Sequence, residues 1–199
     1  MHISEGVLSP PVLLAGGVLT LAGLAIGLKN LKNKKLPEVA VLSSTFFVAS
    51  LIHVPIGPTS VHLILNGLVG LLLGWTSFLA IFLGLLLQAL LFQFGGLTTL
   101  GVNTFDMALP AVICWYLFRS FEKKENLKLS FIGGFLAGSL SVFLAGIFTS
   151  LALYFTEHNF ISVAKALLIA HLPIAIIEGF ITAFVVTYLL KVKPEAIYE

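Results

Sequence analysis

Residues 129–156 read LSFIGGFLAGSLSVFLAGIFTSLALYFT, and no charged side chain interrupts them. A helix of this length can cross the hydrocarbon core of a bilayer, which takes about 20 apolar residues. The run is typical of the whole chain, because 58% of its 199 residues are hydrophobic and 10% carry a charge. An ordinary soluble domain has about 25% charged residues. The sequence therefore predicts an integral membrane domain whose apolar surface faces lipid.

Six further apolar segments extend this prediction to an all-α, polytopic fold with about seven transmembrane helices. The predicted spans are residues 10–28, 38–55, 61–75, 77–95, 105–120, 129–156 and 163–190. Together they form one membrane domain over residues 1–199. The single cysteine, Cys114, lies in an apolar run and is expected to pack as a small hydrophobic side chain.

Basic residues mark one side of this predicted domain. They are Lys29, Lys32, Lys34 and Lys35 in one loop, Arg119, Lys123, Lys124 and Lys128 in another, and Lys191 and Lys193 in the tail. Cytoplasmic loops carry the excess of Lys and Arg, so this side is predicted to be cytoplasmic. The N-terminus is then outside and the C-terminus inside, in a multi-pass protein of a prokaryotic cell membrane.

The first six residues, MHISEG, lie on the predicted outer side. No basic stretch precedes the first apolar run, so a cleaved signal peptide is not expected. Met1 is expected to survive processing, because the large side chain of His2 disfavours its removal. The terminal amine, the amide nitrogen of His2 and its ring Nδ1 can then chelate one metal ion through fused five- and six-membered rings.

A chelate that includes a deprotonated amide favours metals with strong, planar nitrogen fields. Ni(II) and Cu(II) are such ions, and Co(II) is a further option. A fourth nitrogen would close the plane, and His62 or His53 could supply it from the outer face. The chain has no carboxylate cluster of the kind that Mg²⁺ or Ca²⁺ prefers.

Four polar residues near or within the spans are candidates for supporting or gating roles. Asp106 either orients a ligand histidine or is a solvated, capping aspartate. Asn103 lies in the same outer segment. His171 and Glu178 are seven residues apart on one helix face inside the last span. Ionisable residues there suggest function, although a polar contact that holds spans together explains them equally well.

Several sequence motifs are absent, and their absence narrows the function. The chain has no G-x-x-x-x-G-K-[ST] loop for ATP hydrolysis, no nucleophile elbow and no H-E-x-x-H motif. It is therefore not expected to be an enzyme, and nothing in it suggests nucleic-acid binding.

Four segments together resemble the CbiM/NikM family, the substrate-binding membrane components of energy-coupling factor type cobalt and nickel uptake transporters. The segments are MHISEG (1–6), IHVPIGPTSVHLILNG (52–67), GGLTTLGVNTFDMALP (95–110) and HLPIAIIEGFIT (171–182). The resemblance implies that residues 1–9 are inserted into the outer face. It also implies that Met1 gives its amine, His2 its amide and imidazole nitrogens, and His62 the remaining nitrogen.

The resemblance further implies that Ni²⁺ or Co²⁺ is the transported substrate and that no organic cofactor is present. The implied partners are a membrane coupling component, a pair of ATP-binding cassette ATPases and a small accessory membrane subunit. His62 is preferred to His53 because the family's ligand histidine follows a short Gly/Ser-rich stretch after a proline. The alternative is a stand-alone divalent-metal channel or ion-coupled carrier with His171 and Glu178 on its pathway. The sequence does not choose between nickel and cobalt, although the planar nitrogen site favours nickel.

Overall fold

A computed structural model of the chain describes residues 2–32, 35–51, 53–56, 59–121 and 126–198, with the backbone alone for 53–56, 59–61 and 198. Its described part contains seven helices of eight residues or more, in agreement with the predicted number. They are α1 (Pro10–Asn30), α2 (Leu36–Ala49), α3 (Asn66–Leu73), α4 (Ser77–Phe92), α5 (Leu100–Phe118), α6 (Leu127–Thr156) and α7 (Ile161–Val192). A short terminal helix, α8 (Glu195–Tyr198), and three single 3-10 turns, η2 (Gly74–Thr76), η3 (Arg119–Phe121) and η4 (His158–Phe160), complete the helical part.

Two of the predicted spans, 38–55 and 61–75, are wrong in their extent. A hairpin of β1 (His53–Ile56) and β2 (Thr59–His62) separates the two helices, and its antiparallel pairing sets His53 opposite His62. Pro55 lies in β1, six residues beyond the end of α2 at Ala49. The fold is thus helical throughout except for this hairpin, as far as the structure describes the chain.

The number of span-length helices is also lower than predicted. Five helical segments of the described chain are long and apolar enough to cross a membrane, counting α3, η2 and α4 as one segment from Asn66 to Phe92. Helix α2 has 14 residues and α3 has eight. At about 1.5 Å per residue, α3 extends for only about 12 Å.

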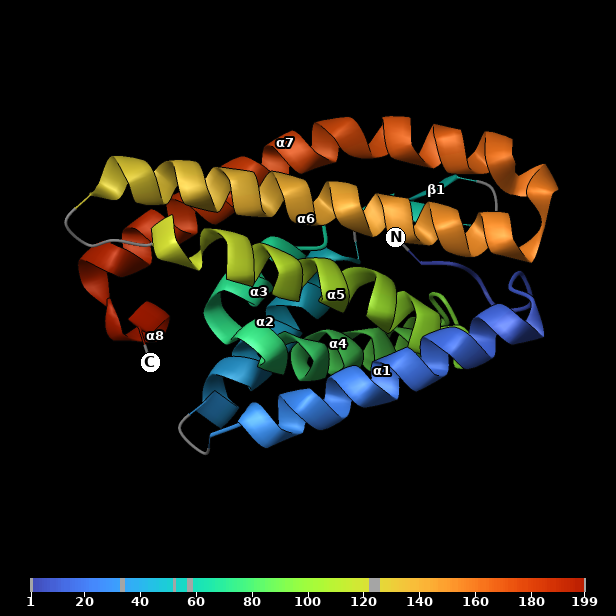
Figure 1. The fold of residues 1–199 in the computed structure, drawn as a ribbon, viewed down its shortest axis with the longest axis horizontal. Helices are drawn as coiled ribbons and strands as arrows, with labels where there is room; N and C mark the ends of the chain where they lie inside the picture. The colour runs from blue at the N-terminus through green and yellow to red at the C-terminus, as the bar shows by residue number, and fades with distance from the viewer. Residues whose placement is uncertain (1, 33–34, 52, 57–58, 122–125, 199) are drawn as a thin grey trace.

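Helices α6 and α7 form the longest contact of the molecule and run antiparallel along one face (Figure 1). Glycines allow this close approach. A Cβ added at Gly138 of α6 would lie 2.6 Å from the carbonyl oxygen of Glu178 and 2.9 Å from the Cα of Gly179 on α7. The two backbones are therefore packed directly on each other, as small residues permit in membrane helix pairs.

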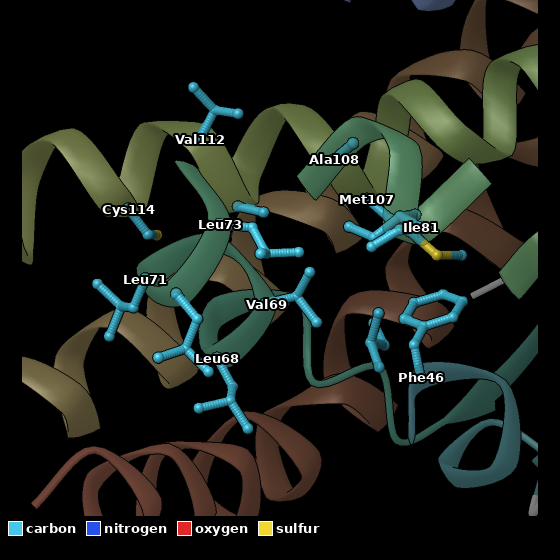
Figure 2. Close-up of a cluster of buried hydrophobic side chains, with 14 of the residues drawn as sticks. Phe46, Leu68, Val69, Leu71, Leu73, Ile81, Met107, Ala108, Val112 and Cys114 are labelled. Carbon is cyan, nitrogen blue, oxygen red and sulfur yellow. The ribbon is translucent and has the colours of Figure 1, made fainter. Parts of the chain in front are cut away.

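Helix α3 is the centre of the core, and all of its residues are buried. Figure 2 shows leucines of α3 packed among Phe46 of α2, Ile81 of α4 and Met107 of α5. Cys114 of α5 is a free, fully buried thiol in the same cluster, which confirms its predicted role as a small hydrophobic side chain. An all-apolar helix of this kind is stable only when protein or lipid surrounds it.

The basic segments lie together at one end of the molecule. The C-terminal ends of α1, α5 and α7 all lie at the left in Figure 1. Aromatic residues accompany them: the guanidinium carbon of Arg119 lies 4.5 Å from the centre of the Trp115 ring, and the Trp75 Nε1 donates to the Tyr116 hydroxyl at 2.9 Å. Trp, Tyr and Arg are enriched where membrane helices meet the headgroups. The opposite end carries the start of α1 and the turn from α6 to α7.

Candidate metal site

The N-terminal segment turns inward before α1 begins, and Figure 1 shows it running between the helices. His2 is 4% exposed and Ile3 is fully buried. Ile3 packs with Leu8, Val102 and Leu153 in a small apolar cluster of its own. Apolar burial at Ile3 and Leu8 thus holds the segment, and the polar His2 is carried into the interior with it.

Asn103 of α5 fixes the backbone of this segment. The amide N–H of Ile3 donates to Asn103 Oδ1 at 2.9 Å, and Asn103 Nδ2 donates to the Ile3 carbonyl oxygen at 3.1 Å. The same Nδ2 lies 3.2 Å from the Thr99 hydroxyl oxygen. The backbone N–H and carbonyl of the buried Ile3 are therefore both satisfied by one side chain, as buried backbone groups require.

The loop between α4 and α5 lies against the same segment. A Cβ on Gly95, whose φ is +77°, would come 3.0 Å from Asn103 Nδ2 and 3.6 Å from the Cβ of His2. At Gly96 an added Cβ would meet the carboxylate of Glu5 at 2.6 Å. Two glycines thus let this loop approach the terminal segment at backbone distance, with left-handed conformations that other residues rarely adopt.

His2 meets His62 in the interior, although the two residues are far apart in the sequence. Their imidazole rings are stacked, with centroids 4.4 Å apart and planes at 26°. His62 is 2% exposed and is the last residue of β2. Metal–imidazole bonds are about 2.0–2.1 Å long, so nitrogens of two rings at this separation can reach one ion.

The hydrogen bonding of His62 determines which of its nitrogens is available to a metal. Its Nδ1 lies 2.7 Å from the carbonyl oxygen of Leu63, and because a carbonyl only accepts, Nδ1 carries the proton. The lone pair is then on Nε2, in the arrangement common for ligating histidines. Burial lowers the pKa of His62 well below 6.5, and the positive charges of the N-terminal amine and of His2 lower it further. The ring is therefore neutral at neutral pH, as metal binding requires.

Two other residues that the sequence predicts as metal ligands are not fully described by the structure. Met1 is outside the described residues. The backbone of His53 pairs with His62 across the hairpin, but its side chain is not described.

His171 and Glu178 are both buried on α7 but make separate contacts. His171 Nδ1 lies 2.6 Å from the Leu167 carbonyl oxygen, so it donates to the preceding turn of the helix. Its Nε2 is buried and makes no hydrogen bond within the described part of the chain. The Glu178 carboxylate instead accepts from the backbone N–H groups of Ile64 and Leu65. Glu178 is thus joined to the chain just beyond His62 rather than to His171.

Asp106 is buried on α5, where it lies beside residues of α1 and α6. It lines a groove of about 500 Å³ with residues that include Gly16 of α1 and Phe148 of α6, and it interacts with the Thr149 hydroxyl. It is therefore not the solvated or capping aspartate that was one of its predicted roles. His158 is exposed in η4, with its ring centroid 4.7 Å from that of Tyr154.

Within the described residues, no three His, Cys, Asp or Glu side chains form a group able to hold a metal ion. A site built on two imidazoles and backbone nitrogens does not need such a group. Sequence reasoning missed the residues that support this arrangement, above all Asn66 and Ser141. The Ser141 hydroxyl lies 3.0 Å from Asn66 Oδ1, and both side chains are buried. The signal was available, since Asn and Ser inside apolar spans commonly bond across helices.

Comparison with known proteins adds evidence independent of this geometry. Residues 2–196 of the chain match the protein family CbiM, which is described as a cobalt uptake substrate-specific transmembrane region. A Haemophilus influenzae protein whose name describes metal transport is 47% identical over 98% of this chain and 96% of its own length. The cobalt transport protein CbiM of Thermosipho melanesiensis is 34% identical over 100% of this chain and 90% of its own length. An Archaeoglobus fulgidus protein whose name describes a fused nickel transport protein, NikMN, is 30% identical over 100% of this chain and 68% of its own length.

Solved structures agree with these sequence relatives. The crystal structure of a transition metal transporter is similar with a TM-score of 0.81, at 30% identity, over 100% of this chain and 96% of that chain. The predicted resemblance is thereby confirmed in sequence and in fold.

Proposed function

The chain belongs to the CbiM/NikM family of cobalt and nickel uptake membrane proteins, and from this premise we propose that it captures Ni²⁺ or Co²⁺ for an ATP-driven transporter. It is a multi-pass membrane protein and a non-enzymatic transport component. The capture step is proposed to take place on the extracytoplasmic side, opposite the end that carries the basic residues.

The proposed ligands are four nitrogens: the Met1 amine, the amide and ring nitrogens of His2, and one ring nitrogen of His62. The observation that carries this proposal is the stacking of the His2 and His62 rings at 4.4 Å in the interior. Burying two imidazoles side by side is costly unless their polar nitrogens have a use. A metal ion bound by one in-plane nitrogen of each ring would give both imidazoles such a use.

This ligand set favours nickel over cobalt. Deprotonation of the His2 amide requires a metal that gains from a strong planar field, and nickel precedes cobalt in affinity for nitrogen ligands. Asn103 supports the chelate, because it fixes the peptide of Ile3 next to the His2 carbonyl. The metal is the cargo of the protein, so the site must also release it.

The proposed partners are a membrane coupling component, ATP-binding cassette ATPases and a small accessory membrane subunit. The sequence contains no phosphate-binding loop, and in this proposal the ATPases supply the hydrolysis.

The alternative function is a stand-alone channel or ion-coupled carrier. It is favoured by the buried Nε2 of His171, which has no hydrogen-bond partner among the described residues, and by the buried carboxylate of Glu178 on the same helix. Transport of Ni²⁺ into liposomes that contain only this protein separates the two functions. A capture subunit alone moves little metal without its ATPases, whereas a channel or carrier moves metal down its gradient unaided.

Titration calorimetry with Ni²⁺, Co²⁺ and Zn²⁺ tests the site. It compares the native chain with a chain extended by one residue before Met1, which moves the amine out of the chelate ring. We expect tight one-to-one binding of Ni²⁺ or Co²⁺ by the native chain and loss of that binding on extension. Equal affinity in both chains would reject the terminal chelate.

A further inference from the structure

Glu178 is the most deeply buried carboxylate near the proposed site. It lies in the middle of α7 and is fully buried. One of its oxygens accepts the backbone N–H of Ile64, and the other accepts the N–H of Leu65 at 2.8 Å. Both oxygens of the buried carboxylate thus accept a backbone N–H, as buried polar groups require.

The two N–H groups belong to the short segment that joins His62 to α3. Leu65 ends this segment in a left-handed conformation, with φ of +55°. A leucine rarely adopts that conformation, and it persists only where surrounding contacts hold it. The Glu178 carboxylate provides such a contact at the strained residue itself and at the residue before it.

The next residue, Asn66, is held by other helices. Its Nδ2 donates to the carbonyl oxygens of Met107 on α5 at 3.1 Å and of Ser141 on α6 at 3.3 Å. The segment is therefore held by two separate sets of hydrogen bonds. Asn66 secures the start of α3, while Glu178 secures the peptides that stand between α3 and His62.

We propose that Glu178 is the positioning residue for His62: its carboxylate holds the peptides of Ile64 and Leu65 and thereby keeps the His62 ring against His2. This inference rests on the proposed function and deepens it, since it assigns Glu178 to the placement of a ligand rather than to a metal pathway. Because α7 carries the carboxylate, the placement of His62 depends on the position of α7.

A double-mutant cycle tests this role. Ni²⁺ affinity and the visible absorption band of the Ni²⁺ complex are measured for the native protein, Glu178→Gln, His62→Ala and the double variant. Glutamine keeps the shape of the side chain but has one acceptor oxygen instead of two. Thr182→Val is the matched control, because Thr182 is fully buried one turn further along α7 and its hydroxyl has no hydrogen-bond partner in the described chain.

We expect Glu178→Gln to weaken Ni²⁺ binding by about 10- to 100-fold and to shift the absorption band toward that of His62→Ala. In the His62→Ala background the same change should have almost no further effect, because the residue that it positions is gone. Thr182→Val should retain the affinity and the band of the native protein.

Two outcomes would overturn the inference. If Glu178→Gln weakens Ni²⁺ binding equally in the native and the His62→Ala backgrounds, Glu178 acts on the fold or on the metal directly. Unchanged binding in Glu178→Gln, while His62→Ala binds weakly, would remove the inference and leave the proposed function intact. If His62→Ala itself binds normally, the proposed site fails instead. Should Glu178→Gln not fold, Glu178→Asp replaces it in the same cycle. We expect Glu178→Asp to weaken Ni²⁺ binding less than Glu178→Gln would, and the same two outcomes would overturn the inference.

Discussion

The Asn103 side chain holds the backbone of Ile3 by two hydrogen bonds, accepting one of 2.9 Å from the Ile3 N–H and donating one of 3.1 Å to the Ile3 carbonyl oxygen. The two residues are 100 positions apart in the sequence. Through this pair, α5 sets the position of the peptide that follows His2. The geometry of the proposed chelate therefore depends on a residue outside the proposed ligand set.

Replacement of Asn103 by alanine is expected to weaken Ni²⁺ binding by about 10- to 100-fold, the usual range for residues that support metal ligands. The loss arises because the Ile3 peptide is left without its partners and the terminal segment loosens. Calorimetric titration of the purified variant measures the effect. Thr104→Val is the matched control, because the Thr104 hydroxyl bonds only the preceding turn of its own helix at 2.7 Å. If both variants bind alike, the Asn103 pair does not support the site.

Binding of nickel is expected to release protons. The proposed chelate removes one proton from the His2 amide and, at neutral pH, part of another from the terminal amine, whose ordinary pKa is about 7.7–8.0. Calorimetry in buffers of different ionisation enthalpy should therefore report release of more than about one proton per metal ion. The chain extended before Met1 should release fewer. Release of no protons by the native chain would contradict amide ligation.

The stability of the metal-free protein should fall in mild acid because of His62. Burial lowers the pKa of this ring well below 6.5 in the folded state. As pH falls below 6.5, the unfolded chain takes up a proton that the folded chain does not, so unfolding becomes easier. The contribution is at most about 1.4 kcal/mol for each pH unit.

Thermal unfolding between about pH 7.5 and 5.5 measures this effect. The Tm of the native protein should decrease more steeply than that of His62→Gln, in which the buried titrating ring is removed. His158→Gln is the control, because that histidine is exposed, and its Tm should follow the native dependence. A His62→Gln variant with the native dependence would assign the acid sensitivity to other groups.

Close packing of α6 on α7 should make Gly138 intolerant of substitution. An alanine Cβ there would lie 2.6 Å from the carbonyl oxygen of Glu178, so the helices must separate. Overpacking of this kind costs about 1–3 kcal/mol. Gly17→Ala on α1 is the control, since no atom lies within 4 Å of its added Cβ and alanine favours the helix.

The measurement is the Tm of each variant together with its Ni²⁺ affinity. Gly138→Ala should unfold at lower temperature and bind metal more weakly, because the displaced α7 carries Glu178. Gly17→Ala should be neutral or slightly stabilised. A Gly138→Ala variant as stable as the native protein would mean that α6 and α7 adjust without separating.

Much of the site could be named from the sequence, but its supports could not. His2 and His62 were identifiable because both the chemistry of an N-terminal histidine and the family's loop pattern pointed to them. Asn103 and Glu178 were recognisable as candidates for supporting or gating roles, but their contacts were not. Their partners are backbone groups of Ile3, Ile64 and Leu65, and no sequence pattern distinguishes one backbone N–H from another.

The sequence by itself determined the membrane location, the largely helical fold and the gathering of basic loops at one end. These properties follow from the local balance of apolar and charged residues, which each segment carries independently of its neighbours. Only the tertiary structure decided where α2 and α3 end, that a hairpin lies between them, and that His2 stacks on His62. Those features depend on which helices become neighbours, because a buried peptide must find its hydrogen bonds from whatever side chain the packing brings to it.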